Sequence, residues 1–204
     1  DPTKTQSGRT SAEPRGFGGT LDAFTSGKLI EIGIAKIIES ITPNKTIGLD
    51  FDLKYKVNQK FNLENQFSLV NGYDVTLDEA LINMPPASIK NQIIYNNSKS
   101  NNLKLSFQSE YVFKQNEFPN NDFTVFIPQT ERFELVELST PPKAYQLLNF
   151  NSSIDLNIFK KTKMNLTFRI NNLLNTSYRN YLNRLRYYSH ELGRNFTLNI
   201  KFNY

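Results

Sequence analysis

The residues that could bind or transform a ligand gather in one polar segment near the end of the chain. This segment carries Arg179, Arg184, Arg186, Tyr187, Tyr188, His190 and Arg194. In one interpretation the guanidinium groups bind an anionic ligand, such as a metal chelate, while the tyrosine rings stack on it. In the other they are structural, contacting anionic lipid head groups or filling a polar wall. The structural interpretation is favoured because Arg and Tyr are common at membrane interfaces.

The residue types present give little reason to expect a catalytic site. The chain has a single histidine, His190, and no cysteine, which excludes a site with two imidazoles, a thiolate zinc site, a cysteine nucleophile and a disulfide scaffold. Ser189 beside His190 does not make a triad. Gly16-x-Gly18-Gly19 is followed by no Lys-Ser/Thr pair and is no phosphate loop. We therefore expect no enzyme activity, cofactor or metal, and the modest net charge of +5 gives no reason to expect nucleic acid.

Strict alternation of apolar and polar residues marks most of the chain from Lys45 onward. It predicts strands at about 45–57, 61–69, 89–95, 103–113, 145–159, 164–170 and 196–204. Residues 1–27 are predicted to be loop-like, because Gly and Pro fall among small polar residues without a period. Within the loop-rich N-terminal segment 1–45, residues 28–38 fit a strand, although the same residues can be wound as an amphipathic helix.

The connections between these strands alternate in length. Short turns are expected at 58–60, 96–102 and 160–163, and long segments at 71–87, 114–143 and 172–192. One side of each strand is apolar and uncharged while the other is fully polar. These features predict an all-β fold of antiparallel transmembrane β-barrel strands in a bacterial outer membrane, because a barrel has short turns at one end, long loops at the other and a polar lumen. A soluble sandwich also alternates but does not sort its loops by length.

The barrel interpretation predicts where several further residues lie. Asp50, Asp52, Lys54 and Arg169 are expected to face the lumen as part of a polar ladder. The last strand carries Phe202 and stops at Tyr204, and a terminal strand that ends in an aromatic residue is an assembly signal in bacterial outer-membrane proteins.

Four acidic residues stand out in the long segment at 114–143. They are Asp122, Glu131, Glu134 and Glu137. These carboxylates could contact a cationic ligand or a partner protein, but a solvated loop is the simpler interpretation.

The last third of the chain resembles a known family. The run Asn171-Asn172-Leu173-Leu174-Asn175-Thr176-Ser177-Tyr178 resembles the N-N-L-(L/F)-(N/D)-x-x-Y signature near the end of TonB-dependent receptors. So do Tyr181-Leu182-Asn183-Arg184-Leu185-Arg186-Tyr187 and Gly193-Arg194-Asn195-Phe196, while Leu81-Ile82-Asn83-Met84-Pro85-Pro86-Ala87 resembles a family loop that leads into a strand. The resemblance runs from about Thr46 to Tyr204, and the Asn- and Lys-rich composition resembles that of Bacteroidetes members.

This resemblance implies a barrel of roughly 22 strands with a plug in its lumen. The chain supplies seven strands, or eight with 28–38, and no plug, and it begins at Asp1 without an initiator Met. We therefore expect a C-terminal barrel portion, 46–204, of a receptor that imports a scarce solute such as a ferric siderophore or other metal chelate. The implied partners are outer-membrane lipid and lipopolysaccharide, the remainder of the barrel and plug, TonB through that plug, and a surface lipoprotein.

Other classes remain open on the sequence. Eight strands could close a small stand-alone outer-membrane barrel with an adhesin or structural role. A receptor-like subunit of a larger outer-membrane assembly would have the same strands. A soluble β-domain would turn its polar face toward bulk water and bury its apolar face in a core.

Overall fold

The computed structural model describes the backbone of residues 16–25, 28–41, 44–137, 139–159 and 162–203. The strands are β1 (Gly16–Thr25), β2 (Lys28–Ile41), β3 (Asn44–Lys56), β4 (Phe61–Asp74), β5 (Glu79–Ala80), β6 (Ser88–Asn97), β7 (Leu103–Val112), β8 (Phe123–Ile127), β9 (Arg132–Val136), β10 (Tyr145–Phe159), β11 (Thr162–Asn171) and β12 (Asn195–Asn203). A short 3₁₀ helix, η1 (Arg184–Tyr187), interrupts the last long loop. None of the helical segments in the described part of the chain is long and apolar enough to cross a membrane.

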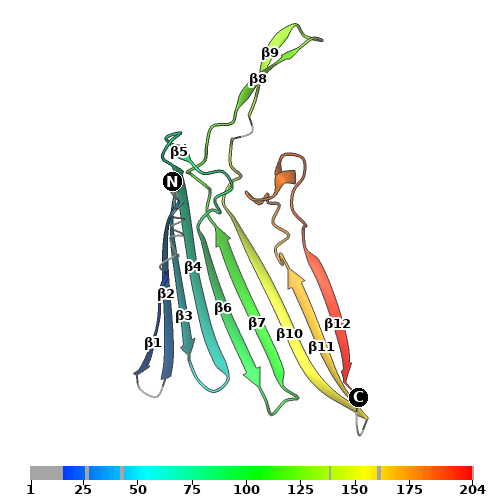
Figure 1. Cartoon of the computed structure of the whole chain (residues 1–204). Coiled ribbons are helices and arrows are strands. Elements are labelled where there is room, and N and C mark those ends of the chain that lie inside the picture. Colours follow the sequence, from blue (N-terminus) through cyan, green and yellow to red (C-terminus); the bar gives the residue numbers. More distant parts are fainter. Residues whose placement is uncertain (1–15, 26–27, 42–43, 138, 160–161, 204) are drawn as a thin grey trace, which may run out of the picture.

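The main sheet is a single antiparallel layer. Its strands follow the order β1-β2-β3-β4-β6-β7-β10-β11-β12, with β5 paired to β4 at one side of this path. The sheet is open, so β1 and β12 form its two edges (Figure 1). A separate two-stranded sheet, β8-β9, extends from the long connection between β7 and β10. This architecture confirms the prediction of an all-β, antiparallel, partial barrel.

The strand registers place the apolar residues of neighbouring strands side by side. Phe51 pairs with Phe67, and Ile93 pairs with Phe107. Further along the sheet Phe168 pairs with Leu198. These cross-strand pairs give the sheet one continuous apolar face, as the period-two alternation of a strand requires.

The opposite face is polar across the same strands. Gln92 pairs with Gln108 in the middle of the sheet, and Lys90 Nζ lies 3.5 Å from Glu110 Oε1. On β10 the Asp155 carboxylate accepts a hydrogen bond of 2.7 Å from the Asn165 side chain. Amide and charged side chains on this face therefore bond mainly to one another across strands.

No second layer built from the described residues covers the apolar face. Ile93 is 50% exposed, Phe107 39% and Phe202 54%. Among the described residues no large side chain is completely buried, and Ile94, Val112 and Tyr181 are the only hydrophobic residues in the buried class. A water-soluble domain needs a core between two packed layers, so these strands do not have the arrangement of a soluble β-domain.

The turns at one end of the sheet are short and rich in asparagine, because the Asn side chain can bond to nearby backbone and Asn tolerates positive φ. Asn58 Oδ1 accepts from the backbone N–H groups of Lys60, at 2.8 Å, and Phe61, at 2.9 Å. Asn101 and Asn102 adopt φ values of 54° and 51° in the β6–β7 turn. The three long connections, 75–87, 113–144 and 172–194, emerge at the opposite end of the sheet (Figure 1).

Two elements differ from what the alternation predicts. Gly16–Thr25 is strand β1 rather than a loop, because its backbone pairs with β2 over ten residues whereas its glycines remove the side-chain period. The segment at 114–143 contains the hairpin β8-β9, whose strands of five residues are too short for alternation to reveal. The strand expected at 28–38 is β2 and extends to Ile41.

Candidate functional site

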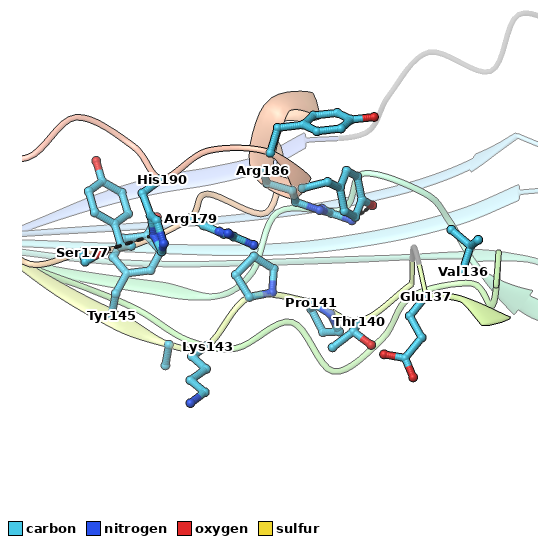
Figure 2. Close-up of a pocket in the computed structure, with 15 residues that line it drawn as sticks. Val136, Glu137, Thr140, Pro141, Lys143, Tyr145, Ser177, Arg179, Arg186 and His190 are labelled. Carbon is cyan, nitrogen blue, oxygen red and sulfur yellow. Dashed lines mark hydrogen bonds between the residues drawn. The ribbon is translucent and has the colours of Figure 1, made fainter. Parts of the chain in front are cut away.

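A cleft of about 790 Å³ opens between the two largest long loops (Figure 2). One wall comes from the segment just before β10 and the other from the loop between β11 and β12. The lining residues are Val136, Glu137, Thr140, Pro141, Pro142, Lys143, Ala144, Tyr145, Ser177, Tyr178, Arg179, Arg186, Tyr187, Tyr188 and His190. Five of the seven candidate ligand contacts of the polar segment therefore meet here, whereas Arg184 and Arg194 do not line the cleft.

Asn172 fixes the start of the β11–β12 loop. It has a positive φ of 53° and is only 3% exposed. Its side-chain Oδ1 accepts from the Thr176 N–H at 2.8 Å, and its Nδ2 donates to the Thr176 carbonyl at 2.8 Å. Its own N–H donates to Asn149 Oδ1 of β10 at 2.9 Å. The Asn-rich signature thus closes a tight loop and ties it to the sheet.

Asn175 joins the start of this loop to its end. Its Oδ1 accepts from the Arg194 N–H at 2.9 Å. A Cβ built on Gly193 would lie 2.6 Å from the same Oδ1, so a larger residue there would force the Asn175 side chain to move away from this bond. The loop base is consequently closed by side-chain bonds to backbone on both sides.

Arg186 is held by two tyrosines. Its guanidinium carbon lies 4.2 Å from the centre of the Tyr181 ring and 4.8 Å from that of Tyr187. One Nη donates to the Tyr181 carbonyl, and the other donates to the Tyr187 hydroxyl at 2.6 Å. These contacts are typical of cation–π packing. They make Arg186 a structural support for η1 and leave its guanidinium group less able to bind a ligand than the sequence predicts.

Arg179 has a different environment. In Figure 2 its guanidinium projects into the cleft between His190 and Pro141. Its Nε, like that of Arg186, is buried without a hydrogen-bond partner, and such a donor costs free energy unless something else accepts from it. Ser177 Oγ lies 3.1 Å from His190 Nδ1 on one side of Arg179. Because both Nη groups of Arg186 already donate to Tyr181 and Tyr187, Arg179 is the arginine of the cleft better suited to bind an anion.

Aromatic rings form the floor of the cleft toward the sheet. Tyr145 at the start of β10 and Tyr178 have ring centres 4.5 Å apart. Burial raises the pKa of Tyr178, and the nearby carboxylates of Glu191 and Glu110 raise it further. Burial likewise raises the pKa of Tyr181, against an opposing effect of Arg186. Both hydroxyls are therefore neutral hydrogen-bonding groups at physiological pH.

Charge in the cleft favours an anionic ligand. Its lining holds three cationic residues, Lys143, Arg179 and Arg186, and one acidic residue, Glu137. Tyr188, which also lines the cleft, is 86% exposed. The sequence alone does not place Tyr145 or the proline pair before it at this cleft, because these residues lie far from Arg179 in the chain and only the fold brings them together.

The residues predicted to face a lumen all lie on the polar face. Asp50 pairs with Ser68, Asp52 with Gln66 and Lys54 with Glu64. Arg169 donates from Nε to Asn151 Oδ1 at 3.2 Å. In the described part of the chain no group of three or more His, Asp or Glu residues could hold a metal ion.

The predicted assembly signal is described only in part. Phe202 lies on the apolar face, pairs with Met164 and is 54% exposed. Tyr204 lies outside the described residues.

The comparisons with known proteins agree with this architecture. No protein-family model matches the chain, and no curated protein matches it. Among solved structures, the copper transporter OprC superimposes with a TM-score of 0.61 at 12% sequence identity, over 89% of this chain and 29% of that chain. The chain thus spans less than a third of that transporter's length, and it has the fold of part of a β-barrel wall.

Proposed function

We propose that the chain forms part of the wall and external loops of a TonB-dependent outer-membrane transporter. The observation that carries this proposal is the uncovered apolar face, with Ile93 50% and Phe202 54% exposed, backed across the same strands by a polar face. Hydrocarbon is the environment that accepts such an apolar face, and a solute pathway accepts the polar one. The Asn- and Lys-rich composition supports an origin in a Bacteroidetes-like bacterium.

The open sheet supports a fragment rather than a small stand-alone barrel. Strands β1 and β12 each pair with a single neighbour in the described sheet, so each leaves one edge of backbone groups without strand partners. In hydrocarbon such an edge is costly, and further strands would satisfy it. The partners that follow are the rest of the barrel and its plug, TonB acting through the plug, and the surrounding lipid and lipopolysaccharide.

The solute that suits the cleft is an anionic metal chelate, such as a ferric siderophore. Arg179 offers a buried donor without a partner, and Tyr178 and Tyr187 offer rings and hydroxyls beside it. The chain contains one histidine, two methionines and no cysteine, which leaves few soft ligands for a bare ion in this part of the wall. A chelate brings its own metal ligands and needs only charge and stacking from the protein.

Replacing Arg179 with glutamine in the whole receptor tests the solute proposal. A hydrogen bond to a charged group is worth about 1.5–3 kcal/mol. We therefore expect Arg179→Gln to weaken binding of the ferric siderophore or ferric citrate that supports growth under iron limitation by roughly 10- to 150-fold.

Arg184→Gln is the matched control, because Arg184 has the same charge in the same loop but does not line the cleft. We expect it to leave binding of the same iron chelate unchanged. Equal effects of the two variants on the Kd, or no effect of either, would contradict the assignment of the cleft. Failure of the receptor to insert in the outer membrane would instead contradict the transporter proposal.

A further inference from the structure

The hairpin β8-β9 projects beyond the other long loops and away from the main sheet (Figure 1). Its strands pair with each other from Phe123↔Val136 to Ile127↔Arg132 and with no other strand of the described sheet. An isolated two-stranded hairpin is marginally stable in water, because it has too little apolar surface to bury. This hairpin therefore gains stability if a further surface covers it.

One side of the hairpin presents large apolar side chains to solvent. Phe126 pairs with Phe133, and their ring centres lie 5.3 Å apart. Phe126 is 47% exposed, Phe133 73% and Leu135 59%. Aromatic side chains exposed in a group of this kind are typical anchors of protein–protein interfaces.

The neck of the hairpin is fixed by hydrogen bonds of buried polar side chains. Ser139 is 7% exposed, its Oγ accepts from the Asn121 N–H at 2.6 Å, and its N–H donates to Asp122 Oδ1 at 2.8 Å. Below it Gln115, also 7% exposed, donates from Nε2 to the Met84 carbonyl at 2.7 Å. A clamped neck preorganises the hairpin and so lowers the entropy lost when it binds.

The charge of the hairpin narrows the choice of partner. Residues 120–137 contain four acidic residues and one basic residue, a net charge of −3 in a chain whose net charge is +5. The acidic residues are Asp122, Glu131, Glu134 and Glu137. A second copy of the same hairpin would bring like charges together, and anionic lipid head groups would be repelled. A partner surface that combines an apolar groove with Lys and Arg side chains would match both the exposed apolar side chains and the negative charge of the hairpin.

We propose that β8-β9 is a docking arm for a separate extracellular protein, one that receives Phe126, Phe133 and Leu135 in an apolar groove bordered by basic residues. This goes beyond solute import, because none of the proposed anchors Phe126, Phe133 and Leu135 lines the cleft, which β9 reaches only through Val136 at its end. The proposal can therefore hold even if the solute proposal fails.

Photo-cross-linking in living cells tests this proposal on the whole receptor. Benzoylphenylalanine replaces Phe133, where it conserves the aromatic ring, and in a matched control it replaces Leu192, which is 77% exposed in the other long loop. We expect the probe at residue 133 to cross-link to a segment of another protein that carries apolar and basic residues. The cross-link yield at residue 133 should be at least tenfold higher than the yield at residue 192. Cross-links to the receptor's own loops, to a second copy or to lipopolysaccharide, or none at residue 133 and at a second probe position, Phe126, would overturn the proposal.

A charge-reversal variant gives a second readout. Glu131→Lys leaves Phe126, Phe133 and Leu135 unchanged and should lower the cross-link yield at residue 133 at least tenfold. Raising the salt concentration should lower the yield of the unaltered receptor in the same direction. A yield that responds to neither change would overturn the assignment of a basic partner.

Discussion

A lysine placed at Ile93 should report directly whether the apolar face meets lipid. Ile93 lies near the middle of β6, is 50% exposed and faces Phe107 and Leu63 across the strands. On the lipid face of a barrel, a charged residue near the membrane centre costs about 2–4 kcal/mol. The ratio of folded to unfolded receptor should therefore fall roughly 30- to 900-fold for Ile93→Lys. On a face exposed to water, the same substitution at a half-exposed position would change stability by about 0.5 kcal/mol or less.

The adjacent substitution Gln92→Lys is the matched control. Gln92 lies on the polar face, where its cross-strand neighbours are Glu64 and Gln108, so a new ammonium group there meets a carboxylate and water. Urea titration of the whole receptor in lipid vesicles, followed by its electrophoretic shift on heating, gives the free energy of unfolding for both variants. Equal free energies of unfolding for Ile93→Lys, Gln92→Lys and the unaltered receptor would refute the assignment of the two faces.

Three further substitutions or conditions test the loop that forms one wall of the cleft. Asn172→Ala removes the hydrogen bonds of a side chain that is 3% exposed, so it should destabilise the loop by about 1–3 kcal/mol. Limited proteolysis should then cleave the loop between β11 and β12 faster, and an unchanged cleavage rate would count against the role of Asn172. Gly193→Ala should be destabilising because its Cβ would lie 2.6 Å from Asn175 Oδ1, and the effect on thermal unfolding should shrink when Asn175→Ala is already present; equal effects in both backgrounds would contradict the steric cause. The folded-state pKa values of Tyr178 and Tyr181 are raised by burial, so this loop should keep its full stability below about pH 10 and lose it as pH rises through those values. Spectrophotometric titration should find both hydroxyls among the last to ionise, and ionisation near pH 10 would contradict their burial.

Much of the sheet could be predicted because each strand has two distinct environments. In a strand such as β3, Leu49, Phe51 and Leu53 alternate with Asp50 and Asp52, so the sequence alone predicts which residues lie on the apolar face and which on the polar face. The same signal fails for β1, where glycines leave no side chain to alternate, and the strand depends on backbone pairing with β2. It fails also for β8 and β9, which are short and expose apolar residues on both sides.

The cleft could be predicted only from one side. The cationic and aromatic residues around Arg179 were evident as a local cluster, but Tyr145 and Pro141 come from the preceding loop and carry no signal that links them to it. Nor does composition distinguish Arg179 from Arg186. The difference arises from packing: the Nε atoms of both arginines are buried without a partner, but Tyr181 and Tyr187 flank Arg186 and accept hydrogen bonds from its two Nη groups.

The central claim is that odd-numbered residues of β7 contact lipid and even-numbered ones face the interior of a barrel. A nitroxide spin label placed singly at Leu105, Ser106, Phe107 and Gln108 of the whole receptor in lipid nanodiscs measures this directly. Relaxation by oxygen, which concentrates in hydrocarbon, should be high at 105 and 107 and low at 106 and 108. No alternation in oxygen accessibility, or relaxation at 105 and 107 by a water-soluble nickel complex instead, would contradict the claim.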